Sequence, residues 1–201
     1  MESRGRAGAA LDGRTAGRER NREAVVDAML DLYGAGILEP SADEIAAQSG
    51  VSRRSVFRYF EDLDDLCREA IARQKDRVSH LFLIDEGGDS RQERIDAFVG
   101  HRARLYQAIA PVARVARMRA PLQPVLAEQI RADGALLRGQ LEGHFEADLR
   151  ELDPVSRARS VATADIVTSF EAWELLVERQ GKSSEEAAAV MRQGLERIIP
   201  G

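Results

Sequence analysis

Apolar residues recur along most of the chain at intervals of three and four, which is the spacing of one face of an α-helix, and no segment alternates apolar and polar residues at a period of two. The sequence therefore predicts an all-α fold with about nine helices. The expected helices cover roughly residues 19–33, 41–49, 53–59, 63–86, 90–110, 112–118, 121–149, 154–180 and 184–199.

Residues 41–59 have the local signals of two short helices joined by a tight turn. Ser41 can cap the first helix, and Glu44 stands three residues later, as in a capping box. Gly50 ends that helix, because the turn needs a backbone that adopts a positive φ at little cost. Ser52 can then cap the second helix. With the preceding helix as support, this is the plan of a helix-turn-helix DNA-binding unit.

Several short motifs in this segment resemble the DNA-binding signature of the TetR family of bacterial transcriptional regulators. The matching residues are Ile45-Ala46, Ser49-Gly50-Val51-Ser52, Ser55-Val56, Phe57-Arg58-Tyr59-Phe60 and Asp64-Asp65-Leu66. The resemblance covers about the first third of the chain. It implies a homodimer whose two recognition helices enter successive major grooves of double-stranded operator DNA. It also implies an unknown small-molecule effector that binds the C-terminal domain and releases the operator.

Two positions depart from the family pattern. Family members usually have tyrosine at the position of Phe57, and its hydroxyl binds a phosphate. Many members have lysine near the position of Leu63. Both departures weaken contact with the DNA backbone, for which Arg58 and the N-terminal arginines are expected to compensate.

The sign of the charge changes within the same segment. Arg53, Arg54 and Arg58 belong to the second short helix, and the acids that follow are Glu61, Asp62, Asp64 and Asp65. An arginine can donate two hydrogen bonds to guanine, and a good pair discriminates by about 1–3 kcal/mol. The acids open the next helix, where they stabilise exposed N–H groups and the helix dipole. Phe57 and Phe60 are expected to pack in the core. The expected DNA contacts are Ser41, Ser52, Arg53, Arg54, Ser55, Phe57, Arg58 and Tyr59.

The chain is expected to have three parts. Residues 1–18 are rich in glycine, alanine and arginine and lack apolar periodicity, which predicts a flexible basic arm. The arm either lies in the minor groove of DNA or is a disordered tail. Residues 19–62 are expected to form the helix-turn-helix domain, and residues 63–201 a helical ligand-binding and dimerisation domain.

Polar residues interrupt the apolar stripes of the C-terminal helices, and buried polar groups in an apolar cavity are typical of a ligand site. The expected pocket residues are His101, Leu105, Asp133, Gln140, His144, Asp165, Ser169 and Trp173. The last two expected helices are apolar on more than one side, which favours a two-fold four-helix interface. The expected dimer residues are Ala158, Ala162, Ile166, Phe170, Val190, Met191 and Leu195.

The composition narrows the function further. The formal net charge of −5 argues against non-specific coating of nucleic acid, which depends on a basic surface. Cys67 is the only cysteine, which excludes an internal disulfide and suits a cytoplasmic protein. Its place on the apolar face of its helix favours a buried structural thiol over a redox sensor. No run is long and apolar enough to span a membrane.

No catalytic or metal-binding constellation is visible, so we expect no enzyme activity, no cofactor and no metal. His80, His101 and His144 share no metal-ligand spacing. The sequence favours a ligand-responsive repressor. The alternatives are an activator or DNA-binding protein without a small-molecule ligand and, from another class, an all-helical enzyme whose first helices are only structural.

Overall fold

The structure, a computed structural model, describes residues 3–84 and 88–201 of the 201-residue chain, and it describes side chains from Thr15 onward. Met1 and Glu2 of the expected arm, and the helix end expected at Gly87, lie outside the described residues. Throughout the described part, the regular elements are helices and none is a strand, which confirms the all-α class.

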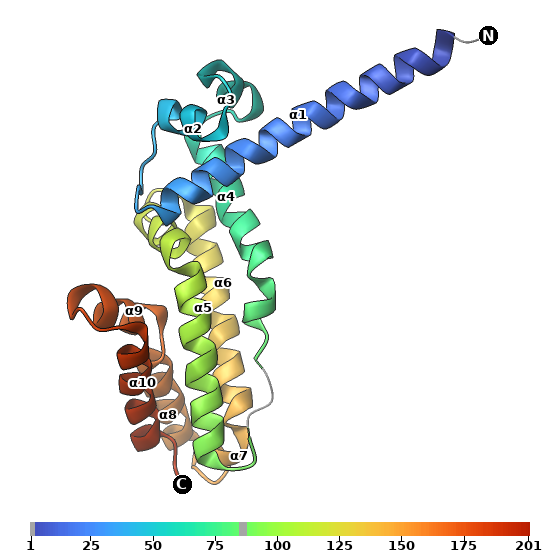
Figure 1. Ribbon diagram of the computed structural model, residues 1–201. Coiled ribbons are helices and arrows are strands. Elements are labelled where there is room, and N and C mark those ends of the chain that lie inside the picture. The colour runs from blue at the N-terminus through green and yellow to red at the C-terminus, as the bar shows by residue number, and fades with distance from the viewer. Residues whose placement is uncertain (1–2, 85–87) are drawn as a thin grey trace. The chain divides into compact units, whose positions relative to one another are not determined.

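The elements follow one another along the chain as Figure 1 labels them. They are α1 (Ser3–Gly34), α2 (Ala42–Ser49), α3 (Arg53–Tyr59), α4 (Leu63–Arg77), the 3₁₀ helix η1 (Ser79–Phe82), α5 (Arg91–Arg119), α6 (Pro124–His144), α7 (Glu146–Leu149), α8 (Pro154–Val167), α9 (Phe170–Glu174), the π-helix η2 (Leu175–Arg179) and α10 (Ser184–Ile198).

The helices form two compact units. Unit 1 consists of Met1–Asp76 and Pro111–Arg119, and unit 2 consists of Arg77–Ala110 and Ala120–Gly201. These are units of packing. The functional boundaries expected at residues 18 and 62 therefore stay predictions.

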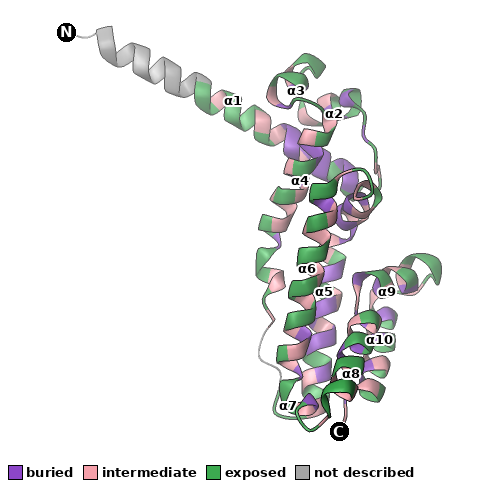
Figure 2. Cartoon of the chain, turned by 180° about the vertical axis from the view of Figure 1, so that it is seen from behind, coloured by how far each residue is buried: buried purple, intermediate pink, exposed green. Residues whose placement is uncertain are grey.

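The core of unit 1 is built by α1 to α4 together with the end of α5. Figure 2 shows that, among the residues of α1 whose burial is described, the buried ones lie toward its C-terminal end. The buried cluster contains Val25, Val26, Met29, Leu30, Leu32, Tyr33, Ile45, Val56, Phe60, Leu66, Cys67, Ala70, Val112 and Val115. Burial of this apolar surface is the main force that holds the three short N-terminal helices against α1.

Local hydrogen bonds fix the turn between α2 and α3 as predicted. Ser41 and Glu44 form the capping box: the Glu44 amide donates to Ser41 Oγ at 3.3 Å, and the Ser41 amide donates to Glu44 Oε2 at 2.8 Å. Gly50 ends α2 with φ of 73°. The Ser55 amide donates to Ser52 Oγ at 3.2 Å and so caps α3. These contacts set the direction in which α3 leaves the turn.

Two of the four acids after α3 act as predicted. The Asp65 amide donates to Asp62 Oδ1 at 2.7 Å, and the Glu61 amide donates to Asp65 Oδ2 at 3.3 Å, so both carboxylates satisfy N–H groups at the start of α4. Asp64 forms an ion pair with Arg119 at the end of α5, within unit 1. The change in charge sign therefore marks the border between α3 and α4.

Two helices extend beyond their predicted limits. α1 begins at Ser3 and not at Glu19, so the described part of the expected arm is helical. Alanine and arginine are good helix formers, and they offset the cost of the glycines, about 1 kcal/mol each. α5 continues through Pro111, where a break was expected. Proline removes a helical hydrogen bond, but the residues that follow it, Val112 and Val115, are buried and hold the helix in place.

Several other helices are shorter than predicted. α4 ends at Arg77 and is followed by η1, and α6 begins at Pro124 with Gln123 as its N-cap, not at Pro121. The helix expected over 154–180 is interrupted, because the side chain of Ser169 caps α9 by accepting from the Ala172 amide at 3.1 Å. A cap of this kind competes with the backbone bonds of a continuous helix.

In the core of unit 2, aromatic rings of α5 pack against Phe145, which lies between α6 and α7, and against Phe170 of α9. The ring centroids of Phe98 and Phe145 are 5.3 Å apart, and those of Tyr106 and Phe170 are 5.6 Å apart. The Tyr106 hydroxyl donates to the Thr168 carbonyl oxygen at 2.6 Å, at the point where α8 ends. This bond satisfies a carbonyl that the helix break would otherwise leave without a partner.

Two glycine-to-alanine variants test the turn. Gly50→Ala should destabilise the protein by roughly 1–2 kcal/mol, because an L-residue is strained at positive φ. Gly139→Ala, at an exposed helical position of α6, should stabilise it by roughly 0.5–1 kcal/mol. Neither added Cβ would meet another atom within 4 Å, so the difference isolates the backbone. Urea denaturation followed by circular dichroism measures both, and equal effects would contradict the strain at Gly50.

Candidate nucleic-acid interface

α3 packs against the core of unit 1 on one side and presents its arginines to solvent on the other. Val56 is fully buried and Phe60 is 2% exposed, and they lie one helical turn apart. Arg53, Arg54 and Arg58 are exposed, as predicted.

The prediction for Phe57 as a core residue is wrong, because its side chain is 45% exposed. It follows Val56 directly and so lies about 100° around the helix from the buried side. Phe60 lies in the core, as predicted. An exposed aromatic ring among arginines is available for contact with a partner of α3.

The arginines at the start of α3 differ in what they contact. Arg53 forms an exposed ion pair with Asp43 of α2, with Nη1 and Oδ2 3.2 Å apart. Arg54 pairs with no residue in the described part of the chain. Exposed ion pairs contribute about 0–1 kcal/mol, so Arg53 can exchange its partner at little cost. Both guanidinium groups can therefore bind an anion or a base edge.

Arg58 and Tyr59 form a pair at the end of α3. Arg58 Nη2 donates to Tyr59 Oη at 2.9 Å, and the Arg58 guanidinium lies 5.0 Å from the centre of the Tyr59 ring. The hydrogen bond from Arg58 lowers the pKa of Tyr59, and a hydrogen bond with Asn21 and the positive charges of Arg58 and Arg18 lower this pKa further. Arg18 and Asn21 belong to α1, so two elements meet at this phenol.

The predicted serine contacts are all exposed or half-buried and belong to helix caps. Ser41 Oγ donates to Glu44 Oε2 at 2.7 Å, and Ser52 Oγ lies 3.0 Å from Ser55 Oγ. Their contact with phosphates stays a prediction, as does that of the rest of the expected DNA-binding set.

The expected ligand-pocket residues fall into separate groups in unit 2. Gln140 and His144 lie on α6 opposite α5, whereas Trp173 packs near Tyr106, with ring centroids 6.2 Å apart. His101 and Leu105 are buried in α5. The remaining members have local roles: Asp133 accepts from Gln129 at 2.9 Å, Asp165 pairs with Arg138 at 2.8 Å, and Ser169 caps α9.

Arg102 of α5 is the residue that sequence reasoning missed in this region. Its side chain is 1% exposed and donates to the Leu137 carbonyl oxygen at 2.7 Å and to Gln140 Oε1 at 3.0 Å. The guanidinium also lies 4.6 Å from the centre of the Phe98 ring. These described partners are neutral, and burial lowers the pKa of Arg102. The sequence did contain a signal for this burial. Arg102 stands four residues after Phe98 and four before Tyr106, on an apolar stripe.

His144 lies beside this arginine. Its Nε2 is 2.8 Å from the Arg94 carbonyl oxygen, and burial lowers the pKa of the ring. The positive charges of Arg94 and Arg102 lower this pKa further. The imidazole is therefore neutral near pH 7 and donates to the carbonyl.

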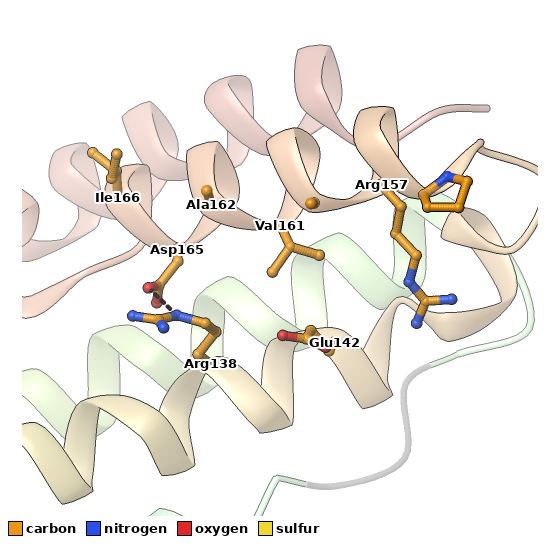
Figure 3. A pocket seen from close by; sticks show the side chains of 9 residues that line it. Arg138, Glu142, Arg157, Val161, Ala162, Asp165 and Ile166 are labelled. Atoms are coloured by element: carbon orange, nitrogen blue, oxygen red, sulfur yellow. Dashed lines mark hydrogen bonds and ion pairs between the residues drawn. The ribbon is translucent and has the colours of Figure 1, made fainter.

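An open groove of about 650 Å³ lies between α6 and α8 (Figure 3). Figure 3 shows Asp165 of α8 pointing toward Arg138 of α6, while Glu142 and Arg157 line the groove further along. The apolar lining consists of Pro154, Ala158, Val161, Ala162 and Ile166. Arg138 and Glu142 of α6 and Arg157 and Asp165 of α8 supply both signs of charge beside this apolar lining, so the groove has no excess of positive charge.

The expected dimer residues divide into exposed and buried members. Phe170, Met191 and Leu195 are 3%, 1% and 0% exposed, so the structure assigns them to the core of unit 2, where they cannot face a second chain. The exposed members are Ala158, Ala162, Ile166 and Val190. α8 and α10 bury one side in unit 2 and expose the other, and both sides have apolar residues. The sequence therefore did not distinguish the buried members from the exposed ones.

The described residues also bear on three other properties: the role of Cys67, metal binding and membrane spans. Cys67 is fully buried, and burial raises the pKa of its thiol, so it is the structural cysteine that the sequence favoured. Among the described residues, no group of three or more His, Cys, Asp or Glu side chains could hold a metal ion. None of the described helices has the length and apolar character needed to cross a membrane.

Similarity to known proteins is confined to three-dimensional structure. No protein-family model matches the chain, and no curated protein matches it. A transcriptional regulator from Rhodococcus sp. Rha1 aligns with a TM-score of 0.65 at 20% identity, over 90% of this chain and 95% of that chain. A TetR-family transcriptional regulator from Streptomyces coelicolor aligns with a TM-score of 0.66 at 18% identity, over 90% of this chain and 79% of that chain. The chain therefore has the fold of TetR-family transcriptional regulators, as the sequence motifs implied.

Tyr59 and Tyr33 are expected to ionise at opposite ends of the tyrosine range. The pKa of Tyr59 lies below its usual value, whereas burial raises the pKa of Tyr33. In a titration followed by tyrosinate absorbance, Tyr59→Phe should remove the earliest phase. The pKa of Tyr33 in the folded protein exceeds the value of about 10 in the unfolded chain. The neutral phenol therefore contributes to the stability of the folded state below about pH 10, and this contribution is lost as the pH rises further. An unchanged early phase in Tyr59→Phe would contradict the Arg58 contact.

Proposed function

We propose that the protein is a dimeric, ligand-responsive transcriptional repressor that binds operator DNA through α3. The observation that carries this proposal is the exposed face of α3, with Arg53, Arg54, Phe57 and Arg58 on a helix capped at the Gly50 turn. A short helix that is anchored on one side and cationic on the other matches the shape and charge of the major groove.

The arginines at the start of α3 are assigned to base recognition. Arg54 has no partner in the described residues, and Arg53 has only an exposed one, so guanine O6 and N7 can take both guanidinium groups. Arg58 and Tyr59 are assigned to phosphates, which fix the position of the helix without reading sequence. The local basic face explains how a chain of net charge −5 can bind DNA.

The exposed apolar side of α8 and α10 is assigned to the dimer. Ile166 is 67% exposed, Val155 58% and Val190 41%, and large apolar side chains left exposed on these helices favour association. A second copy packed on α8 would also cover the groove between α6 and α8. A two-fold dimer would then present two copies of α3 to half-sites about 34–36 Å apart.

The effector is assigned to unit 2, around Arg102, Gln140 and His144. Polar groups in an otherwise apolar helix pair are typical of a ligand site, and a ligand that replaces one acceptor of Arg102 would rearrange α5 against α6. The effect on DNA is a population shift: a ligand weakens operator binding by its difference in affinity between the two conformations.

Selection of DNA by the purified protein tests the first step. The wild-type protein should enrich a motif from a random library, and binding should weaken steeply as salt rises. Arg53→Ala/Arg54→Ala should lose the preference for that motif, at about 1–3 kcal/mol for each guanine contact. Arg104→Ala/Arg131→Ala removes the same charge from exposed positions of unit 2 and is the matched control. Enrichment of the same motif by both double variants would contradict the assignment of α3.

A single substitution tests the dimer. Ile166→Asp should convert the dimer into a monomer, because it buries an unpaired carboxylate in the proposed interface. Val125→Asp on α6 has nearly the same starting exposure, 64% against 67%, and should leave the dimer intact. Sedimentation equilibrium measures the mass of each variant. If Ile166→Asp remains dimeric, the interface lies elsewhere on the chain.

A further inference from the structure

The register of α1 against α3 and α4 is set by Arg22. Its guanidinium forms a bidentate ion pair with Glu69 of α4 and lies 5.0 Å from the centre of the Phe60 ring. This side of α1 therefore faces the end of α3. Arg18 precedes Arg22 by four residues, so it belongs to the same side, about 6 Å further toward the N-terminus.

Arg18 and Asn21 lie beside the phenol of Tyr59. The charge of Arg18 and the side chain of Asn21 both act on the pKa of Tyr59, which places them near its hydroxyl. On the α3 side, Arg58 donates to the same hydroxyl at 2.9 Å. Groups from two helices thus converge on one exposed point of unit 1.

The two arginines at this point have no carboxylate partner among the described residues. Arg58 contacts the hydroxyl of Ser55 and the hydroxyl and ring of Tyr59, and Arg18 forms no ion pair within the described chain. Arg22 differs, because Glu69 neutralises it. The site therefore offers several hydrogen-bond donors to one anion: two guanidinium groups, an amide and a phenol. No described carboxylate of the protein occupies the place of that anion.

We propose that Arg18 and Asn21 of α1 join Arg58 and Tyr59 of α3 in one phosphate-binding site, which holds the DNA backbone next to the bases that α3 reads. The inference depends on the proposed function. A phosphodiester fits because its unesterified oxygens accept hydrogen bonds and carry the opposite charge. Phe57 has no polar atom to contribute, so the backbone contact at this end of α3 falls to Tyr59 and its neighbours.

The Arg58–Tyr59 contact orders this site before DNA arrives. The guanidinium is held both by the hydroxyl and by the face of the ring, so fewer rotamers are lost on binding than for a free arginine. The Tyr59 hydroxyl accepts from Arg58 and keeps its own proton to donate to a phosphate oxygen.

The test compares two arginines of α1 that differ in position and not in charge. Arg18→Ala and Arg20→Ala each remove one exposed positive charge, and Arg20 lies about 200° around α1 from Arg18, whose charge acts on Tyr59. Affinity for the DNA motif enriched by the wild-type protein is measured across a salt series. Arg18→Ala should lower the slope of log affinity against log salt by about 0.9 per protomer and weaken binding to all sequences alike.

The control Arg20→Ala should keep the wild-type slope. Tyr59→Phe removes a neutral donor, so it should weaken binding without changing the slope. Equal slopes for Arg18→Ala and Arg20→Ala would overturn the inference while leaving α3 as the DNA-binding element. If the wild-type protein enriches no motif, the proposed function fails and this inference fails with it.

Discussion

A helix of seven residues is not stable in water by itself, and α3 exists only because unit 1 holds it. Val56 and Phe60 anchor it in the core, and Ser52 caps its first turn. These contacts use one side of the helix and leave the arginine-bearing side free. Rigid attachment of α3 is what would allow its side chains to meet a fixed pattern of base edges, so the DNA-binding proposal depends on this small set of contacts.

Unit 2 contains a buried cation, the guanidinium of Arg102, which must be stabilised away from water. The desolvation of Arg102 is offset by a backbone carbonyl, an amide oxygen and an aromatic face, all neutral. Such a network is costly to disturb, because removal of one acceptor leaves a buried donor unsatisfied. It is therefore the part of unit 2 in which a bound molecule could shift the packing of α5 and α6 most strongly.

The features that the sequence predicted correctly are those that depend on residues close together in the chain. The caps at Ser41 and Ser52 and the turn at Gly50 depend on residues three or four apart, so their signals are complete within the segment. The exposure of Phe57, the continuation of α5 through Pro111 and the burial of Arg102 depend on partners far along the chain. Apolar pattern alone also could not separate core residues of α10 from exposed ones, because both recur at the same helical spacing. The DNA contacts and the dimer face remain predictions.

Photo-cross-linking from position 57 tests whether α3 lies against the bound DNA. Replacement of the exposed Phe57 by p-benzoylphenylalanine keeps an aromatic ring on α3, and the same replacement of Leu122, which is 85% exposed in unit 2, is the control. With DNA enriched by the wild-type protein, we expect a covalent protein–DNA adduct from position 57 and none from position 122. An adduct from position 122 alone would place the DNA on another surface and contradict α3 as the reading helix.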